Sequence, residues 1–131
     1  MDLDKFMTET MPFTAVLGAE ALAASADEVR LRVAWDATRC TVGGVLHGGL
    51  LMALADSAGA WCAFLNLPSE ARTTTIESKT NLLRAVRDGH VDAVARPLHV
   101  GRTTIVVDTE LRDAAGRLVA RTTQTQAVLP A

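Results

Sequence analysis

The sequence has few cysteines, no block of charge of one sign and no signal-peptide pattern. Cys40 and Cys62, its only cysteines, form no CxxC pair, so neither a disulfide framework nor a zinc site is indicated, and both are expected to be small buried apolar residues. Acidic residues outnumber basic ones by only 15 to 13, which argues against binding to nucleic acid or anionic lipid. The stretch MDLDKFMTETMPF lacks a basic segment and a long apolar core, so a cytoplasmic location is expected.

The longest apolar run, Val45–Leu67, is long enough to span a bilayer, which takes about 20 apolar residues. It has two glycines near its start, carries Asp56 in its middle and has no basic cluster beside it. A carboxylate at the centre of a bilayer costs about 2.5–3.5 kcal/mol, and basic flanks are typical of helices that span one. We therefore expect this run to be a buried helix and predict no membrane span.

At 131 residues the chain fits a single domain, residues 1–131, with a core of its own. Residues 1–17 are expected to form a helix and a turn, because Leu3–Met11 suits a short helix that Pro12 would end. From Glu28 to Trp35 charged and apolar residues alternate, which predicts a half-buried strand. A loop, residues 36–44, is expected to follow.

The run Val45–Leu65 predicts a helix that is apolar nearly all round, so other elements must surround it. Strands are expected at residues 73–86, 91–100, 103–112 and 117–129, joined by turns at Asp88-Gly89, Gly101-Arg102 and residues 113–116. The third of these strands alternates most clearly, with one face formed by Ile105, Val107, Thr109 and Leu111. This order predicts an α+β fold, in which an antiparallel sheet carries one long helix on a single face. The last four strands of the sheet are predicted to form a meander.

The start and the middle of this helix carry the candidate chemistry. The first N–H groups of a helix are unpaired and partly positive, and the glycines of His47-Gly48-Gly49 would let an anion or an oxyanion approach them. The same glycines could equally serve only to let the helix pack tightly under the sheet. An ionised carboxylate such as Asp56 is energetically costly in an apolar helix unless it is paired, and such a group suits a general base or a nucleophile. Asp56 could equally be a structural carboxylate that bonds to a strand or faces a solvated groove.

Gly48 and Asp56 are too far apart to act on one atom within one chain. Eight residues of helix separate them by about 12 Å, whereas a reacting atom must lie about 3 Å from both the oxyanion donor and the catalytic group. If both serve one reaction, Asp56 of one chain must meet the glycine N–H groups of a second chain across a two-fold axis. Function would then require a homodimer.

The stretch GGVLHGGLLMALADSAG, Gly43–Gly59, resembles the signature of the hotdog-fold acyl-CoA thioesterases, in particular the phenylacetic-acid-pathway (PaaI-like) branch. TTTIESKTNLLRA, Thr73–Ala85, looks like that family's second strand, and the resemblance covers nearly the whole chain, from Gly18 to Leu129. It implies a hotdog fold, in which the sheet wraps one central helix, and hydrolysis of an acyl- or aryl-CoA thioester to a free acid and coenzyme A. It also implies no cofactor, no metal, and a homodimer or a dimer of dimers.

The resemblance further implies roles for single residues. The Gly48 N–H would polarise the thioester carbonyl, and Asp56 would act as general base or as nucleophile. His47 would orient the loop or contact the thioester region. Thr75 falls where relatives often carry a Ser or Thr that holds the attacking water or the acid. Thr41 and Gly49 are expected to bind the substrate. Arg84, Arg102 and Thr103 are expected either to bind it near the coenzyme A arm or to be ordinary strand-end residues without a role in binding.

One position departs from the family pattern. Relatives usually carry Asn or Gln six positions before the signature histidine, where this chain has Thr41, whose hydroxyl is shorter than an amide arm. Two other functions in the same fold stay open: an acyl-CoA-binding protein without turnover, which Thr41 favours and Asp56 disfavours, and a hydratase or dehydratase, which the place of His47 in a glycine loop disfavours. The composition leaves the acyl group, aliphatic or aryl, undecided.

Overall fold

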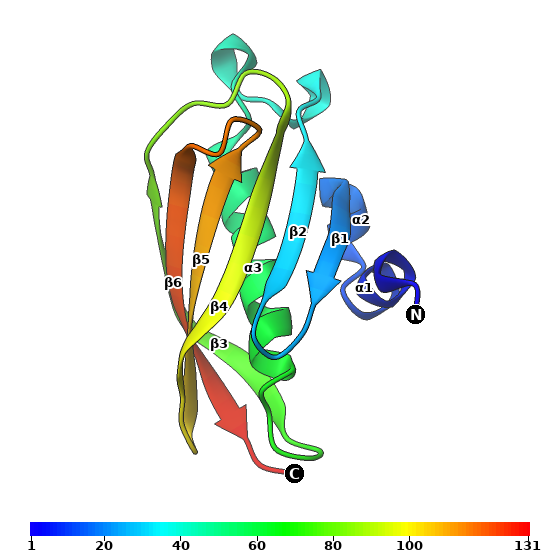
Figure 1. Cartoon of the computed structure of the whole chain (residues 1–131), viewed down its shortest axis with the longest axis vertical. Coiled ribbons are helices and arrows are strands. Elements are labelled where there is room, and N and C mark those ends of the chain that lie inside the picture. The colour runs from blue at the N-terminus through cyan, green and yellow to red at the C-terminus, as the bar shows by residue number, and fades with distance from the viewer.

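Six antiparallel strands form one curved sheet that partly encloses a long helix (Figure 1). The computed structural model describes the whole chain, residues 1–131. The helices are α1 (Leu3–Thr10), α2 (Phe13–Leu17) and α3 (Gly48–Phe64), with short 3₁₀ turns at Ala37–Arg39 and Val42–Gly44. The strands are β1 (Ala19–Ala24), β2 (Val29–Ala34), β3 (Arg72–Leu82), β4 (His90–Val100), β5 (Thr104–Asp113) and β6 (Leu118–Leu129). The predicted α+β architecture, with one long helix on one face of the sheet, is confirmed.

The predicted four-strand meander is wrong. The order of strands in the sheet is β1-β2-β4-β5-β6-β3, so β3 pairs with β6 at one edge, and β1, which was not predicted, forms the other edge. The Asp88-Gly89 pair closes no hairpin but lies in a loop that crosses from β3 to β4 past the start of α3 (Figure 1). Both edges of β4 are occupied, by β2 and by β5, so β3 has no place beside it.

The alternation predicted for the strands is confirmed. In β2 the fully buried residues are Val29, Leu31 and Val33, and in β5 they are Ile105, Val107, Thr109 and Leu111. The intervening residues point outward and form charge pairs across the sheet surface. One of these joins Arg32 of β2 to Asp92 of β4, with an Nε–Oδ1 distance of 2.7 Å.

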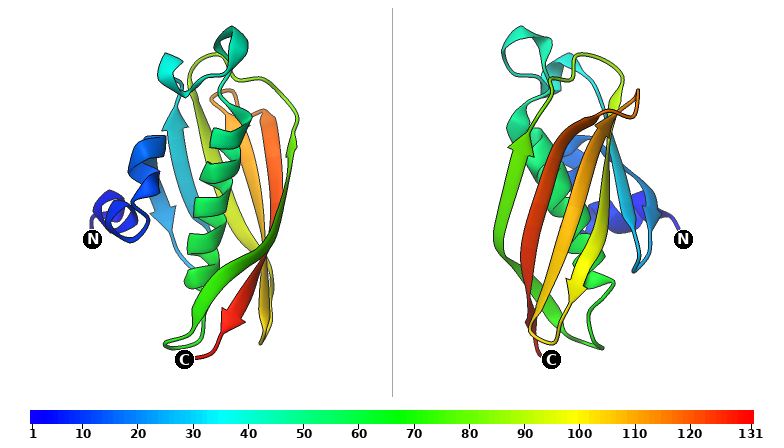
Figure 2. Two further views of the ribbon diagram at one scale, coloured as in Figure 1. Left: turned by 180° about the vertical axis from the view of Figure 1, so that it is seen from behind. Right: turned by 60° about the vertical axis from the view of Figure 1, so that its left-hand side comes forward.

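α3 lies along the concave face of the sheet, with β3 on one side and the β1–β2 pair on the other (Figure 2). The expectation that α3 would be surrounded is wrong for the single chain, because Met52 and Phe64 are 44% and 51% exposed, and Asp56 between them is exposed as well. A single sheet covers only one side of a helix, so the opposite side of α3 remains open. No helix in the structure, α3 included, is long and apolar enough to cross a membrane.

The two N-terminal helices pack beside α3 and β1. The predicted helix is α1, and Pro12 separates it from α2, which ends at Gly18 in the left-handed conformation (φ 74°) that favours glycine. Met7 is 1% exposed and belongs to the main core. Phe6 meets Trp61 of α3 edge to face, with ring centroids 5.6 Å apart. α1 is therefore anchored to the C-terminal half of α3.

The two cysteines differ in environment. Cys62 is buried, as predicted, and burial, assisted by the charge of Asp27, raises the pKa of its thiol to about 11. The thiol is therefore protonated and unreactive at neutral pH. Cys40, predicted to be buried, is only half-buried, in the loop before α3.

Candidate active site

The loop before α3 is held in place by its own hydrogen bonds. Gly43 and Gly44 both have positive φ angles, 80° and 71°, which residues with side chains rarely adopt. The indole N–H of Trp35 donates to the carbonyl oxygen of Gly44 (2.9 Å), and the His47 N–H donates to that of Arg39 (3.0 Å). These bonds fix the point at which α3 begins.

His47 caps α3 and leaves one N–H group free. Its Nδ1 accepts a hydrogen bond from the Gly49 N–H (2.9 Å), and its carbonyl oxygen accepts from Leu50 and Leu51 (3.0 and 3.2 Å). The Gly48 N–H is the only one in the first turn that donates to no protein group. Since Nδ1 acts as an acceptor here, it carries no proton, and the ring reinforces a helix start that presents a single unpaired donor.

A groove of about 330 Å³ passes this helix start, lined by Thr41, Val45, Leu46, Gly48, Leu51, Leu82, Leu83, Arg84 and Ala85. A side chain at Gly48 would not fit easily, because a Cβ there would lie 2.6 Å from the Cδ1 of Leu82. The structure therefore brings two predicted substrate-binding residues, Thr41 and Arg84, to the Gly48 end of the site. The Thr41 hydroxyl is exposed and makes no hydrogen bond within the chain.

Asp56 lies on the open face of α3, about 12 Å along the helix axis from Gly48. In the single chain it faces solvent, and its Oδ1 accepts one long hydrogen bond, from the Nε2 of Gln124 on β6 (3.5 Å). Gln124 is fully buried and its Oε1 has no partner. The amide fits only because residue 59 is glycine, since a Cβ there would collide with it.

A second buried glutamine holds Thr75. The Nε2 of Gln126 donates to the Thr75 hydroxyl (2.9 Å), and the Thr73 hydroxyl lies 3.2 Å from the Oε1 of the same amide. The sequence analysis missed both Gln124 and Gln126. The signal was present, because these residues and Thr122 occupy alternate, inward positions of β6, where a strand that packs on an apolar helix would ordinarily carry apolar side chains.

Arg102 and Thr103 lie elsewhere. They lie near the turn between β4 and β5 and line a cavity of about 420 Å³, together with Pro68, Ser69, Ala71, Val128, Pro130 and Ala131. This turn is at the opposite end of the molecule from the start of α3 (Figure 1). Within one chain Arg102 and Thr103 therefore do not line the groove that Thr41 and Arg84 share, because the length of β4 separates the two ends.

The sequence comparisons identify the family. The family model described as "Thioesterase superfamily" matches residues 43–120, more than half of the chain. The chain belongs to the thioesterase superfamily. The matched segment contains Gly48, Asp56 and Thr75 as well as strands β3 to β5, so the start and open face of α3 lie within the part that defines this thioesterase family.

Relatives and solved structures agree with this placement. The chain is 36% identical over 86 residues, 66% of its length, to the 1,4-dihydroxy-2-naphthoyl-CoA hydrolase of Escherichia coli, and this match covers 63% of that protein. The chain thus spans less than two thirds of the length of several curated relatives that it matches. A mutant thioesterase from Pseudomonas aeruginosa superposes with a TM-score of 0.89 at 29% identity, over 98% of this chain and 94% of that one.

The phenylacetic acid degradation protein PaaI of Thermus thermophilus, solved as a mutant, superposes with a TM-score of 0.82 at 29% identity. That superposition covers 90% of this chain and 99% of the Thermus chain. The hotdog fold and the resemblance to the PaaI-like thioesterases, both expected from residues 43–59 and 73–85, are therefore confirmed.

Proposed function

We propose that this thioesterase-family protein hydrolyses an acyl-CoA thioester to a free acid and coenzyme A. The observation that carries the proposal is the pairing of one unbonded N–H, that of Gly48, with one exposed carboxylate, that of Asp56, on the same helix of a thioesterase fold. A thioester has a good leaving group, so polarising its carbonyl and delivering an oxygen nucleophile is sufficient chemistry.

The proposed reaction uses each group once. The Gly48 N–H donates to the thioester oxygen and stabilises the negative charge that develops when the carbonyl carbon is attacked. Asp56 either takes a proton from the attacking water or attacks itself, forming a mixed anhydride that water then hydrolyses. The C–S bond breaks and coenzyme A leaves as its thiolate. In this proposal the Thr75 hydroxyl orients the water or the acid, and the hydrogen bond that it accepts from Gln126 supports this role.

The proposed site joins two protomers. Within one chain Gly48 and Asp56 are too far apart, whereas a second copy can bring its own Gly48 N–H to the open face of α3. β3, beside that face, is 11 residues long and its outer edge is unpaired, with Ile76 59% exposed. A long exposed edge strand is a template for pairing with another strand. We infer a homodimer formed edge to edge through β3, with two equivalent sites.

The first experiment measures the release of coenzyme A thiol from a panel of acyl-CoA thioesters by wild type and Asp56→Asn. We expect turnover by wild type and a loss of at least 10²-fold in the variant, with circular dichroism and light scattering showing an unchanged fold and dimer. An active monomer would contradict the two-chain site. A single turnover in ¹⁸O-water separates the routes. General-base catalysis puts ¹⁸O into the first product acid, whereas a mixed anhydride that water opens at the Asp56 carboxyl carbon leaves ¹⁸O in Asp56 and an unlabelled first product.

Thr41 favours one alternative, an acyl-CoA-binding protein without turnover. Its hydroxyl lines the groove beside Gly48 but is unbonded and short, so it reaches less far toward a bound carbonyl than an amide would. Calorimetric binding of a thioester together with no thiol release by wild type would establish this alternative. Turnover that rises in Thr41→Gln would instead show that the hydroxyl limits the rate of an active enzyme.

A further inference from the structure

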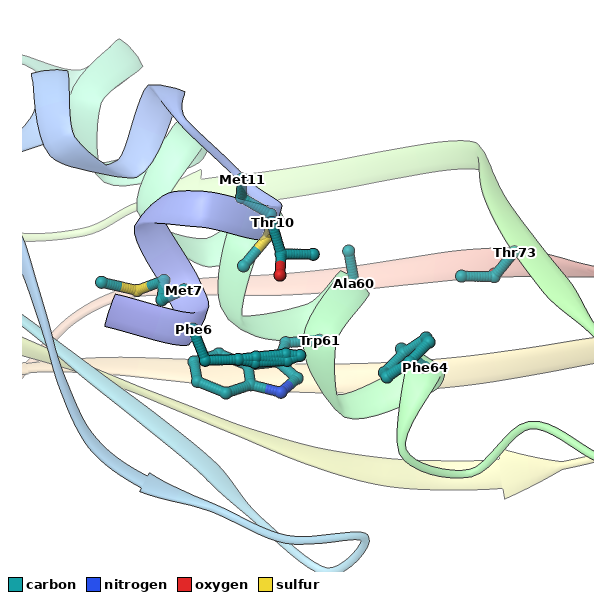
Figure 3. Close-up of a pocket in the computed structure, with 8 residues that line it drawn as sticks. All are labelled: Phe6, Met7, Thr10, Met11, Ala60, Trp61, Phe64 and Thr73. Atoms are coloured by element: carbon teal, nitrogen blue, oxygen red, sulfur yellow. The ribbon is translucent and has the colours of Figure 1, made fainter. Parts of the chain in front are cut away.

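A largely apolar pocket lies between α1 and the C-terminal half of α3 (Figure 3). Its volume is about 260 Å³, and it is lined by Phe6, Met7, Thr10, Met11, Ala60, Trp61, Phe64 and Thr73. The chain has three phenylalanines, two tryptophans and no tyrosine, so this one pocket holds three of its five aromatic rings. For comparison, an engineered apolar cavity of about 150 Å³ admits benzene. The pocket therefore has room for a ring or a chain of several carbons.

One polar group in the pocket wall is left without a partner. Trp61 is 6% exposed, and its indole N–H donates no hydrogen bond, whereas that of Trp35 donates to Gly44. Figure 3 shows the indole nitrogen on the edge of the ring turned toward the Phe64 end of the pocket. The nitrogen atom itself is not fully buried, so it is open to a group that enters the pocket. A ligand in this largely apolar pocket would therefore find one hydrogen-bond donor that no group of the chain occupies.

The pocket continues the open face of α3 on which Asp56 lies. Ala60 is one helical turn beyond Asp56 and Phe64 two turns beyond, so the pocket begins about 6 Å along the axis from the carboxylate and extends to about 12 Å. On the strand side, Thr73 lines the pocket and Thr75 lies two residues further along the same face of β3, with both hydroxyls held by Gln126. A thioester whose carbonyl carbon lies at Asp56 can therefore direct its acyl chain into this pocket.

We propose that the pocket between α1 and α3 binds the distal end of the acyl group, and that α1 forms a roof that sets the size of group accepted. This inference rests on the proposed function, because it places the thioester carbonyl at Asp56. The roof residues Phe6 and Met11 lie in the N-terminal segment, before residues 43–120 that the thioesterase family model matches. The class of substrate is a bulky, apolar acyl group rather than an acetyl group.

The lining favours such a group for physical reasons. Thioether and aromatic side chains give large contact areas, and sulfur–ring and ring–ring contacts add to the burial of an apolar group. Methionine is also flexible, so Met7 and Met11 can adapt to rings or branched chains. An acetyl group would leave the pocket empty or wet and would gain none of these contacts.

The test compares kcat/KM for heptanoyl-CoA and benzoyl-CoA, which have the same number of acyl carbons, with kcat/KM for acetyl-CoA. Wild type should prefer both bulky substrates. Ala60→Leu, which fills the pocket, should reduce the ratio of bulky to acetyl activity about tenfold or more, and Phe64→Ala should reduce it several-fold. Phe13→Ala removes a ring that is 59% exposed on α2 outside the pocket, so the wild-type ratio should persist. An unchanged ratio in both pocket variants would overturn the proposal.

A binding measurement keeps this inference separate from the proposed hydrolysis. Heptanoyl-CoA should change the tryptophan fluorescence of Asp56→Asn protein, and this change should be absent in the double variants with Trp61→Phe or Ala60→Leu. If no thioester is hydrolysed but this fluorescence pattern holds, the pocket is an acyl site and hydrolysis is refuted. If thioesters are hydrolysed but neither the ratio nor the fluorescence depends on these residues, hydrolysis stands and the pocket assignment is overturned.

Discussion

At the scale of single residues, Gly48 offers a substitution that removes one donor and little else. It is the first residue of α3, a position that proline tolerates, and His47 before it has the extended conformation (ψ 130°) that proline requires of its predecessor. Its N–H bonds to no protein group, so the fold loses no hydrogen bond when proline replaces it. We expect Gly48→Pro to be folded but about 10²–10³-fold slower in kcat than Gly48→Ala.

Gly48→Ala is the matched control for this comparison. Both variants introduce a Cβ that presses on the flexible end of Leu82, but only alanine retains the N–H. Steady-state kinetics of the two proteins, with thermal melts to compare their stability, decides the point. Equal rates for the alanine and proline variants would show that the Gly48 N–H does not stabilise the oxyanion.

Gln124 is the second residue on which a prediction rests. Its Nε2 donates to Asp56 from β6, while its buried Oε1 has no hydrogen-bond partner. An unpaired buried oxygen destabilises a fold, so this glutamine is better explained by its contact with the carboxylate than by stability. Gln124→Met should lower kcat about tenfold, the lower end of what a hydrogen bond to a charged group contributes, with little change in KM and no loss of thermal stability. A fall in stability without a fall in kcat would mean that Gln124 is purely structural. Gln126→Met, on the same strand but directed at Thr75, should have the smaller kinetic effect.

At the scale of elements, the pairing of β2 with β4 carries a pH-dependent term. Burial alone would raise the pKa of Asp92, but the hydrogen bonds and charge of Arg32 outweigh burial and hold this pKa below its ordinary value. A carboxyl group whose pKa is lowered by folding stabilises the fold above about pH 4, and this contribution is lost as the pH falls through the lowered pKa. Part of the acid sensitivity of the sheet should therefore come from this pair.

Arg32→Met tests this term. It should lower the free energy of unfolding by about 1 kcal/mol at pH 7, as expected for a partly exposed ion pair, and the difference from wild type should shrink as the pH falls below 4. Urea titrations at a series of pH values measure it. Arg96→Met removes a more exposed cation, 55% accessible, from the same surface and should matter less. A difference that stays constant with pH would show that Arg32 acts through packing alone.

At the scale of the whole molecule, the proposed site exists only if two chains meet. Mixed dimers of Asp56→Asn and Gly48→Pro chains provide a direct test. If each site takes Asp56 from one chain and Gly48 from the other, a mixed dimer has one doubly defective site and one intact site. Random co-assembly of the two inactive proteins should therefore restore about a quarter of wild-type activity, because half of the dimers are mixed and half of their sites are intact. No restoration, in samples shown by mass spectrometry to contain mixed dimers, would place both groups in one chain.

The fold was predictable where the signal is local and not where strands choose partners. Alternation within β2 and β5 fixed which side chains face the core, because successive residues of a strand point to opposite faces. The Asp88-Gly89 turn signal was misleading, since a turn sequence says nothing about whether a better partner strand arrives later. β4 pairs with β2 and β5 instead, and β3 is left at an edge.

The sequence by itself determined the long helix, its glycine start, the acid eight residues beyond Gly48 and the family to which they belong. Only the tertiary structure decided that Asp56 is exposed, that Gln124 reaches it from β6, and that α1 encloses a pocket one turn away. The physical reason is distance along the chain. Helix periodicity and capping depend on neighbours within a few residues, whereas the Asp56–Gln124 contact joins residues 68 positions apart and depends on how the whole sheet curves around α3.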